Sequence, residues 1–119
     1  MIQEESNAKI DKLLKTLEKG FDIPAISTAL LDLREDALKD EDPLLAKVFR
    51  LASEYLLENE CFDHTVEKEE DDEGEEFLLE PGSDAENLSY FLHLTKRADN
   101  KFNREEIKEM RTFLKLKLY

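Results

Sequence analysis

The sequence has no tryptophan, one cysteine, three glycines and three prolines among its 119 residues. The single cysteine, Cys61, excludes an intramolecular disulfide. No run approaches the ~20 apolar residues that a membrane-spanning helix needs, so no membrane partner is expected. The first residues are acidic and contain no long apolar run, which argues against a secretory signal. We therefore expect a cytoplasmic protein.

The chain is rich instead in charged side chains, which make up 39% of the residues. Leucine, glutamate and lysine dominate, and this is the composition of helices with hydrated outer faces. A chain of this length is expected to form one domain, residues 1–119, around a single core. The net charge of −13 predicts repulsion of nucleic acid and of anionic membranes, and it favours a basic protein as partner.

Apolar residues recur at helical spacing in five segments, and they predict an all-α fold, a mostly antiparallel bundle of about five helices. The predicted helices are residues 3–19, a segment from Asp22 to about Lys39, residues 43–60, a segment from Ser83 or Asp84 to about Ala98, and a segment that opens at Asn103.

Helix ends are marked by residues with known capping preferences. Gly20 is predicted to end the first helix in the left-handed conformation. Asp42 followed by Pro43 is typical of a helix start, and a capping-box pattern begins at Asn103. Asp36 is expected to face water, and Leu116 is expected to widen the apolar stripe of the last helix.

The helix at residues 43–60 is apolar over most of its circumference. Such a helix is usually central in its bundle. Alternatively, one face containing Leu44, Leu51 and Tyr55 forms the interface of a homo-oligomer. A structural or assembly subunit that associates through this helix is therefore the alternative function.

Residues 61–83 form a long acidic connection between the third and fourth helices. Its stretch 67–80 holds nine carboxylates, one lysine and one glycine. Phe62 before the acids and Phe77 after them are candidates to anchor the ends on the bundle. The connection is either a loop or a short hairpin across Asp72, Glu73 and Gly74, and we favour the loop because glutamate is a poor strand former.

The acidic stretch does not fit a twelve-residue calcium loop. With Gly74 at the sixth position, Glu80 falls correctly at the twelfth, but Glu69 stands where the loop needs aspartate. Pro81 and Gly82 also stop the helix that should follow. We predict no metal and no cofactor.

Catalytic chemistry is not expected either. No GxGxxG, P-loop, GxSxG or HExxH motif occurs. Cys61 and His64 lie three residues apart, but their acidic surroundings disfavour the thiolate that a nucleophile needs. We predict that the protein is not an enzyme and has no catalytic residues.

Three interpretations of the acidic stretch remain open. The first is a surface that binds or inhibits a basic partner protein; immunity proteins, small inhibitors and nucleic-acid mimics are similar in size and charge. The second is neutralisation within the chain by the basic segment 96–119, which carries eight bases and four acids. The third is a solvated linker. For the first, the predicted binding residues are Glu69, Glu70, Asp71, Asp72, Glu73, Glu75 and Glu76.

Overall fold

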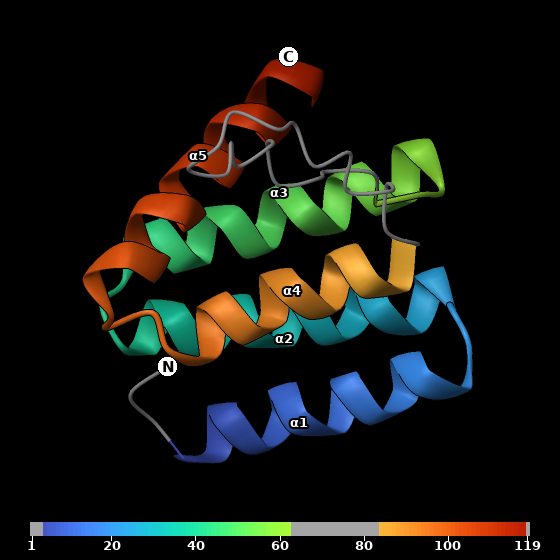
Figure 1. Ribbon diagram of the computed structural model, residues 1–119, viewed down its shortest axis with the longest axis horizontal. Helices are drawn as coiled ribbons and strands as arrows, with labels where there is room; N and C mark the ends of the chain where they lie inside the picture. The colour runs from blue at the N-terminus through green and yellow to red at the C-terminus, as the bar shows by residue number, and fades with distance from the viewer. Residues whose placement is uncertain (1–3, 63–83, 119) are drawn as a thin grey trace, which may run out of the picture.

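The structure is a computed structural model, and it describes residues 4–62 and 84–118. These residues form five α-helices and no strand, which confirms the predicted all-α class. The helices are α1 (Glu4–Lys19), α2 (Ile23–Lys39), α3 (Pro43–Asn59), α4 (Asp84–Lys96) and α5 (Lys101–Leu118), as labelled in Figure 1. Within the described ranges, no helix combines the length and the apolar character that a bilayer crossing requires.

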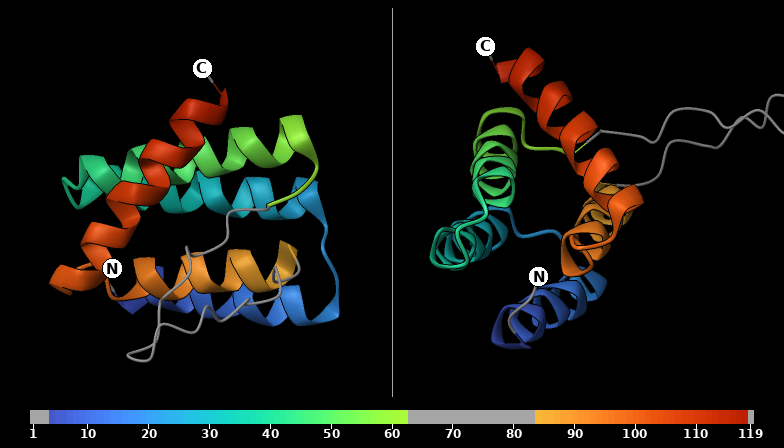
Figure 2. Two further views of the ribbon diagram at one scale, coloured as in Figure 1. Left: turned by 45° about the horizontal axis from the view of Figure 1, so that its top comes forward. Right: turned by 90° about the vertical axis from the view of Figure 1, so that its left-hand side faces the viewer.

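The helices are arranged in two layers. Figure 2 shows α2 and α3 side by side on one side of the molecule, and α1, α4 and α5 on the other. Helices α1 to α4 run alternately in opposite directions, as predicted for a bundle with short connections, whereas α5 crosses α3 obliquely (Figure 1). Helix α4 lies beside α1, although the two are far apart in the sequence.

Helix α3 is the central helix of the core, as its apolar circumference predicts. It packs against α2 and α5. Leu44, Leu51 and Tyr55 are 8%, 0% and 4% exposed. The face that was considered as an oligomer interface is therefore buried within the chain itself. Leu116, which was expected to widen the apolar stripe of the last helix, is instead 76% exposed.

The turn between α2 and α3 ends α2 in a Schellman motif. Asp42 N donates to Ala37 O at 2.9 Å, and Glu41 N donates to Leu38 O at 3.1 Å. Glu41, with φ of 56°, occupies the left-handed position that glycine usually fills. Gly20 was predicted in this conformation and does not adopt it. The non-glycine residues that adopt this conformation in the described structure are Glu41, after α2, and Glu60, the C-cap of α3.

Asp42 connects the ends of three helices. Its backbone N–H ends α2, and its carboxylate accepts a hydrogen bond from Leu45 N at 3.3 Å at the start of α3. The guanidinium of Arg104 on α5 donates to both oxygens of the same carboxylate, at 2.9 and 3.1 Å. Burial acts to raise the pKa of Asp42, but the hydrogen bonds from Arg104 and Leu45 N outweigh burial and lower it.

A second polar cluster connects α1 to α2. Asp36 was expected to face water, but its side chain is only 14% exposed and accepts hydrogen bonds from Ser6 at 2.9 Å and from Lys9 at 3.0 Å. Lys9 also lies 3.1 Å from Asp32. Burial acts to raise the pKa of Asp36, yet the bonds from Lys9 and Ser6 lower it overall. The local sequence pattern of α2 could not predict this contact, because Ser6 lies 30 residues from Asp36 in the sequence.

Helix α5 begins two residues before the predicted start. Asn100 is its N-cap, since Asn100 Oδ1 accepts hydrogen bonds from Phe102 N at 2.9 Å and from Asn103 N at 3.2 Å. Arg104 lies near the start of α5 and reaches Asp42 from there.

The substitution Asp42→Ala removes both the cap of α3 and the partner of Arg104. We expect it to lower the free energy of unfolding by about 2 kcal/mol at neutral pH. Arg104→Gln keeps the cap and should cost only about 0.5–1 kcal/mol. Because the folded state lowers the pKa of Asp42, its contribution is present above about pH 4 and is lost as the pH falls through the folded pKa. Urea unfolding from pH 7 towards pH 2 measures both effects; a cost of Asp42→Ala that does not shrink in acid would contradict the assignment.

Removal of the backbone strain at Glu41, the left-handed residue in the α2–α3 turn, should stabilise the protein. We expect Glu41→Gly to raise the free energy of unfolding by about 0.5–1 kcal/mol, because glycine has no Cβ to clash at positive φ. The matched control is Glu35→Gly, in the middle of α2, which should lower stability by about 1 kcal/mol. Thermal unfolding followed by circular dichroism compares the two, and equal effects of the same sign would show that Glu41 is not strained.

Candidate functional site

The predicted binding residues lie outside the described part of the chain. This applies to Glu69, Glu70, Asp71, Asp72, Glu73, Glu75 and Glu76, to the proposed hairpin, and to the positions tested against a calcium loop. The structure does describe the two points at which the acidic connection leaves the bundle and returns to it. These are Phe62, shortly after α3, and Asp84, the first residue of α4.

The two ends of the acidic connection are hydrogen-bonded to each other. Phe62 N donates to Asp84 Oδ1 at 3.2 Å. One turn later on α4, Asn87 Nδ2 donates to Phe62 O at 2.9 Å. Both backbone polar groups of Phe62 are therefore satisfied by side chains of α4. Phe62 and Asp84, which flank residues 63–83 in the sequence, are therefore neighbours in the fold.

Phe62 anchors this junction in the core, as the sequence predicted for the residue before the acids. It is fully buried. Its ring lies edge-on to Tyr55, with centroids 6.3 Å apart, and tilted against Phe91, with centroids 5.9 Å apart. Such pairs contribute about 0.5–1.5 kcal/mol beyond simple burial. The junction therefore combines an apolar anchor with two hydrogen bonds.

Replacement of residues 63–83 by six glycine and serine residues should leave the bundle intact. We expect the helical circular dichroism signal to persist and the free energy of unfolding to rise by roughly 1 kcal/mol, since a shorter loop loses less entropy on closure. Urea unfolding measures the change. In the same shortened chain, Phe62→Ala should cost about 3–5 kcal/mol, because it empties a buried aromatic site. A shortened chain that no longer unfolds cooperatively would show that the junction alone does not hold the ends.

Acidic residues accumulate around this junction within the described helices as well. Glu58 and Glu60 are exposed at the C-terminal end of α3, and Asp84 and Glu86 lie in the first turn of α4. From position 51 to position 95 the sequence has 15 acids and a single base, Lys68. The charge of the acidic connection is therefore continued by the helices from which it starts. We refer to Glu58, Glu60, Asp84 and Glu86 as the acidic end.

Three basic residues of α5 have partners within the described structure. Arg104 binds Asp42, Lys108 lies 3.5 Å from Glu105, and the ammonium of Lys117 lies 5.8 Å from the ring centroid of Phe113. Whether these bases also neutralise residues 67–80 concerns positions outside the described residues, so the second interpretation of the acidic stretch stays a prediction.

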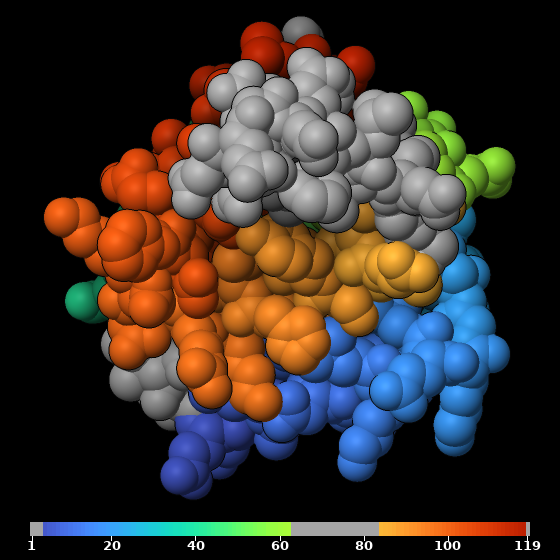
Figure 3. Space-filling model, viewed as in Figure 1, coloured from blue at the N-terminus to red at the C-terminus, as the bar shows by residue number. Residues whose placement is uncertain are grey.

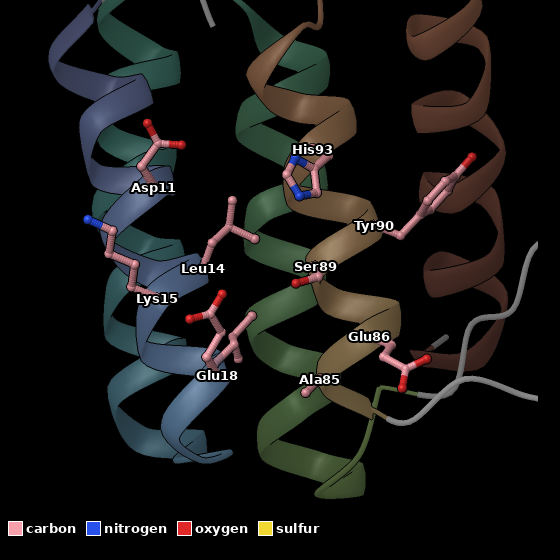
Figure 4. A pocket seen from close by; sticks show the side chains of 10 residues that line it. Asp11, Leu14, Lys15, Glu18, Ala85, Glu86, Ser89, Tyr90 and His93 are labelled. Carbon is pink, nitrogen blue, oxygen red and sulfur yellow. The ribbon is translucent and has the colours of Figure 1, made fainter.

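A groove lies between α1 and α4 and was not found by sequence reasoning. Its volume is about 730 Å³. Figure 4 shows Leu14 and Glu18 of α1 pointing towards α4, where Ser89 and His93 face them; Lys15 points away from α4. The ion pair between Lys96 and Asp11, 2.7 Å long, joins the two helices near one end of the groove. Nothing in the local pattern of either helix indicates that the two are neighbours.

The groove has no arrangement typical of catalysis. Ser89 and His93 lie one turn apart on α4, but no hydrogen bond joins them in the described structure, and a nucleophilic serine needs a base in hydrogen-bonding contact. Across residues 4–62 and 84–118, no three His, Cys, Asp or Glu side chains gather closely enough to hold a metal ion. Tyr90 points towards α5, where its hydroxyl donates to Glu106.

A comparison of the chain with protein families, with curated proteins and with solved structures finds no match. Its function is therefore argued from its own charge distribution and geometry.

Proposed function

We propose that this protein is a non-enzymatic interaction domain that binds, and thereby inhibits, a basic partner protein through its acidic connection. The binding residues are those predicted from the sequence: Glu69, Glu70, Asp71, Asp72, Glu73, Glu75 and Glu76. The observation that carries the proposal is the concentration of negative charge, 15 acids against one base, between positions 51 and 95. The location that we propose is the cytoplasm.

Electrostatics supports a basic protein as the partner. Charge of one sign raises the rate at which an oppositely charged protein is encountered, by up to about a thousandfold at low salt. It repels nucleic acid, which carries the same sign, and competes with phosphate groups for the same basic surface. Inhibition would then follow from occupation of a basic groove that the partner uses for its own polyanionic ligand.

The described junction supports the same proposal. Phe62 is buried, and its hydrogen bonds to Asp84 and Asn87 give the acidic connection a fixed attachment on the bundle. The acidic end adds four carboxylates from α3, α4 and the residue after α3 at this attachment. A binding segment held at both ends loses less conformational entropy when it binds than a free tail does.

Neutralisation of the acidic connection should abolish binding. The variant Asp71→Asn, Asp72→Asn, Glu73→Gln, Glu75→Gln changes the net charge by four and leaves every described contact in place. We expect the wild-type chain to retain basic proteins from a lysate at about 50 mM salt and to release them at a few hundred millimolar, since attraction between exposed charges is screened at the higher concentration. The variant should retain none of them.

A matched control separates the position of the charge from its total. The variant Glu4→Gln, Glu5→Gln, Glu35→Gln, Glu109→Gln changes the net charge equally at four exposed positions of α1, α2 and α5. It should bind like the wild type. Equal retention of basic proteins by all three chains, or equal loss in both variants, would contradict the proposed role of residues 69–76.

A further inference from the structure

We propose that the groove between α1 and α4 seats the apolar side chains of a short amphipathic helix with basic flanks, which the partner supplies. This inference rests on the proposed function and specifies the part of the partner that is recognised: the acidic connection attracts the partner, and the groove receives one segment of it. Such helix-in-groove recognition uses apolar residues at i, i+3 or i+4, and i+7.

The dimensions of the groove suit two turns of a helix. Its walls are α1 from Asp11 to Glu18 and α4 from Ala85 to His93. At 1.5 Å per residue these walls are about 11–12 Å long, which is the length over which a helix presents apolar side chains at i and i+7. Figure 3 shows α1 and α4 side by side on one face of the molecule.

The chemistry of the groove favours an apolar face with basic edges. Leu14 and Leu17 from α1 and Ala85 from α4 supply its apolar surface. The carboxylate of Glu18 points towards α4 at the same end as Ala85, close to the acidic end of the bundle (Figure 4). Lys15, the one lysine among the residues that line the groove, points away from α4. Asp11 is paired with Lys96 at one end of the groove, so the negative charge of the lining is concentrated at the other end, with Glu18 and Glu86, and this end attracts a basic flank of the bound helix.

The groove is formed before any partner arrives. The 2.7 Å ion pair between Lys96 and Asp11 holds α4 to α1 at one end. At the other end, Leu17 and Leu88 are buried in the common core. Tyr90 is held towards α5 by Glu106 and so leaves the α1-facing side of α4 to the smaller Ser89. A preformed site binds without a cost of rearrangement.

A synthetic peptide tests the proposal on the full chain. The probe is a 15-residue helix with leucines at positions 1, 4, 8 and 11 and lysine or arginine on both flanks. The control peptide has the same composition in an order that spreads the leucines around the helix. In a ¹⁵N–¹H NMR titration the amphipathic peptide should shift amide signals of Leu14, Glu18 and Ser89, and it should bind at least tenfold more tightly than the control.

Two variants assign the binding to the groove. Ser89→Trp fills the space between the helices and should lower the affinity for the amphipathic peptide at least tenfold. Thr112→Trp adds the same bulk at an exposed position of α5 and should leave the affinity unchanged. Leu14→Lys puts a positive charge on the half-exposed wall of the groove and should weaken binding as well, which covers the case in which Ser89→Trp does not fold. Circular dichroism reports the folding of each variant.

The outcomes for the groove and for the proposed function are separate. Equal affinity of the two peptides, shifts confined to other helices, or unchanged binding in both folded groove variants would overturn the groove. The chain neutralised at Asp71, Asp72, Glu73 and Glu75 should bind both peptides more weakly and keep the preference for the amphipathic one. If that chain binds both peptides as tightly as the wild type, the proposed function fails while the groove stands.

Discussion

The carboxylate of Asp42 accepts hydrogen bonds from the start of α3 and from the guanidinium of Arg104 at the start of α5, while its backbone N–H ends α2. These bonds join the end of α2 and the starts of α3 and α5 at one point, from which α5 crosses α3 (Figure 1). The crossing places Ile107, Met110 and Leu114 of α5 in the core. The rings of Tyr55 on α3 and Phe113 on α5 lie 6.1 Å apart between centroids, so the crossing helix covers this face of α3.

The opposite end of the bundle is built differently. There, the junction between Phe62 and α4 is made by a buried aromatic ring and two hydrogen bonds to backbone groups. The residues of the acidic end flank this junction in the sequence, whereas basic partners hold the carboxylates of Asp42, Asp36 and Asp11 elsewhere in the fold. Opposite charges thus meet where ion pairs join one helix to another. Negative charges are instead concentrated in and next to the acidic connection. This division makes a binding role for the acidic residues compatible with a stable core.

Features that depend on residues close together in the sequence could be predicted, and those that depend on distant residues could not. The helices, the cap at Asp42 and the central position of α3 depend on residues within a few positions of one another, and local periodicity and capping preferences are sufficient to find them. The pairing of Asp42 with Arg104 spans 62 residues, and that of Ser6 with Asp36 spans 30, so nothing local indicates them. Gly20 was predicted to end α1 in the left-handed conformation because glycine adopts it without strain, but Gly20 does not adopt it; Glu41 and Glu60, after α2 and α3, do. The groove exists because α1 and α4 are neighbours, which is a property of the topology. The predicted binding residues 69–76 lie outside the described chain and stay a prediction.

The long connection between α3 and α4 also has a consequence for the order of folding. Helices α1 to α3 leave the ribosome well before α4 and α5, and the side chains of α3 that α5 covers have no partner until the last helix is made. Every contact between the two parts closes a loop through residues 63–83, and folding slows as more contacts are remote in sequence. We therefore expect the α2–α3 pair, whose contacts are the most local, to form before α4 and α5 dock. During that interval the nascent chain exposes apolar surface next to its most acidic segment, and like-charge repulsion between such intermediates opposes their aggregation.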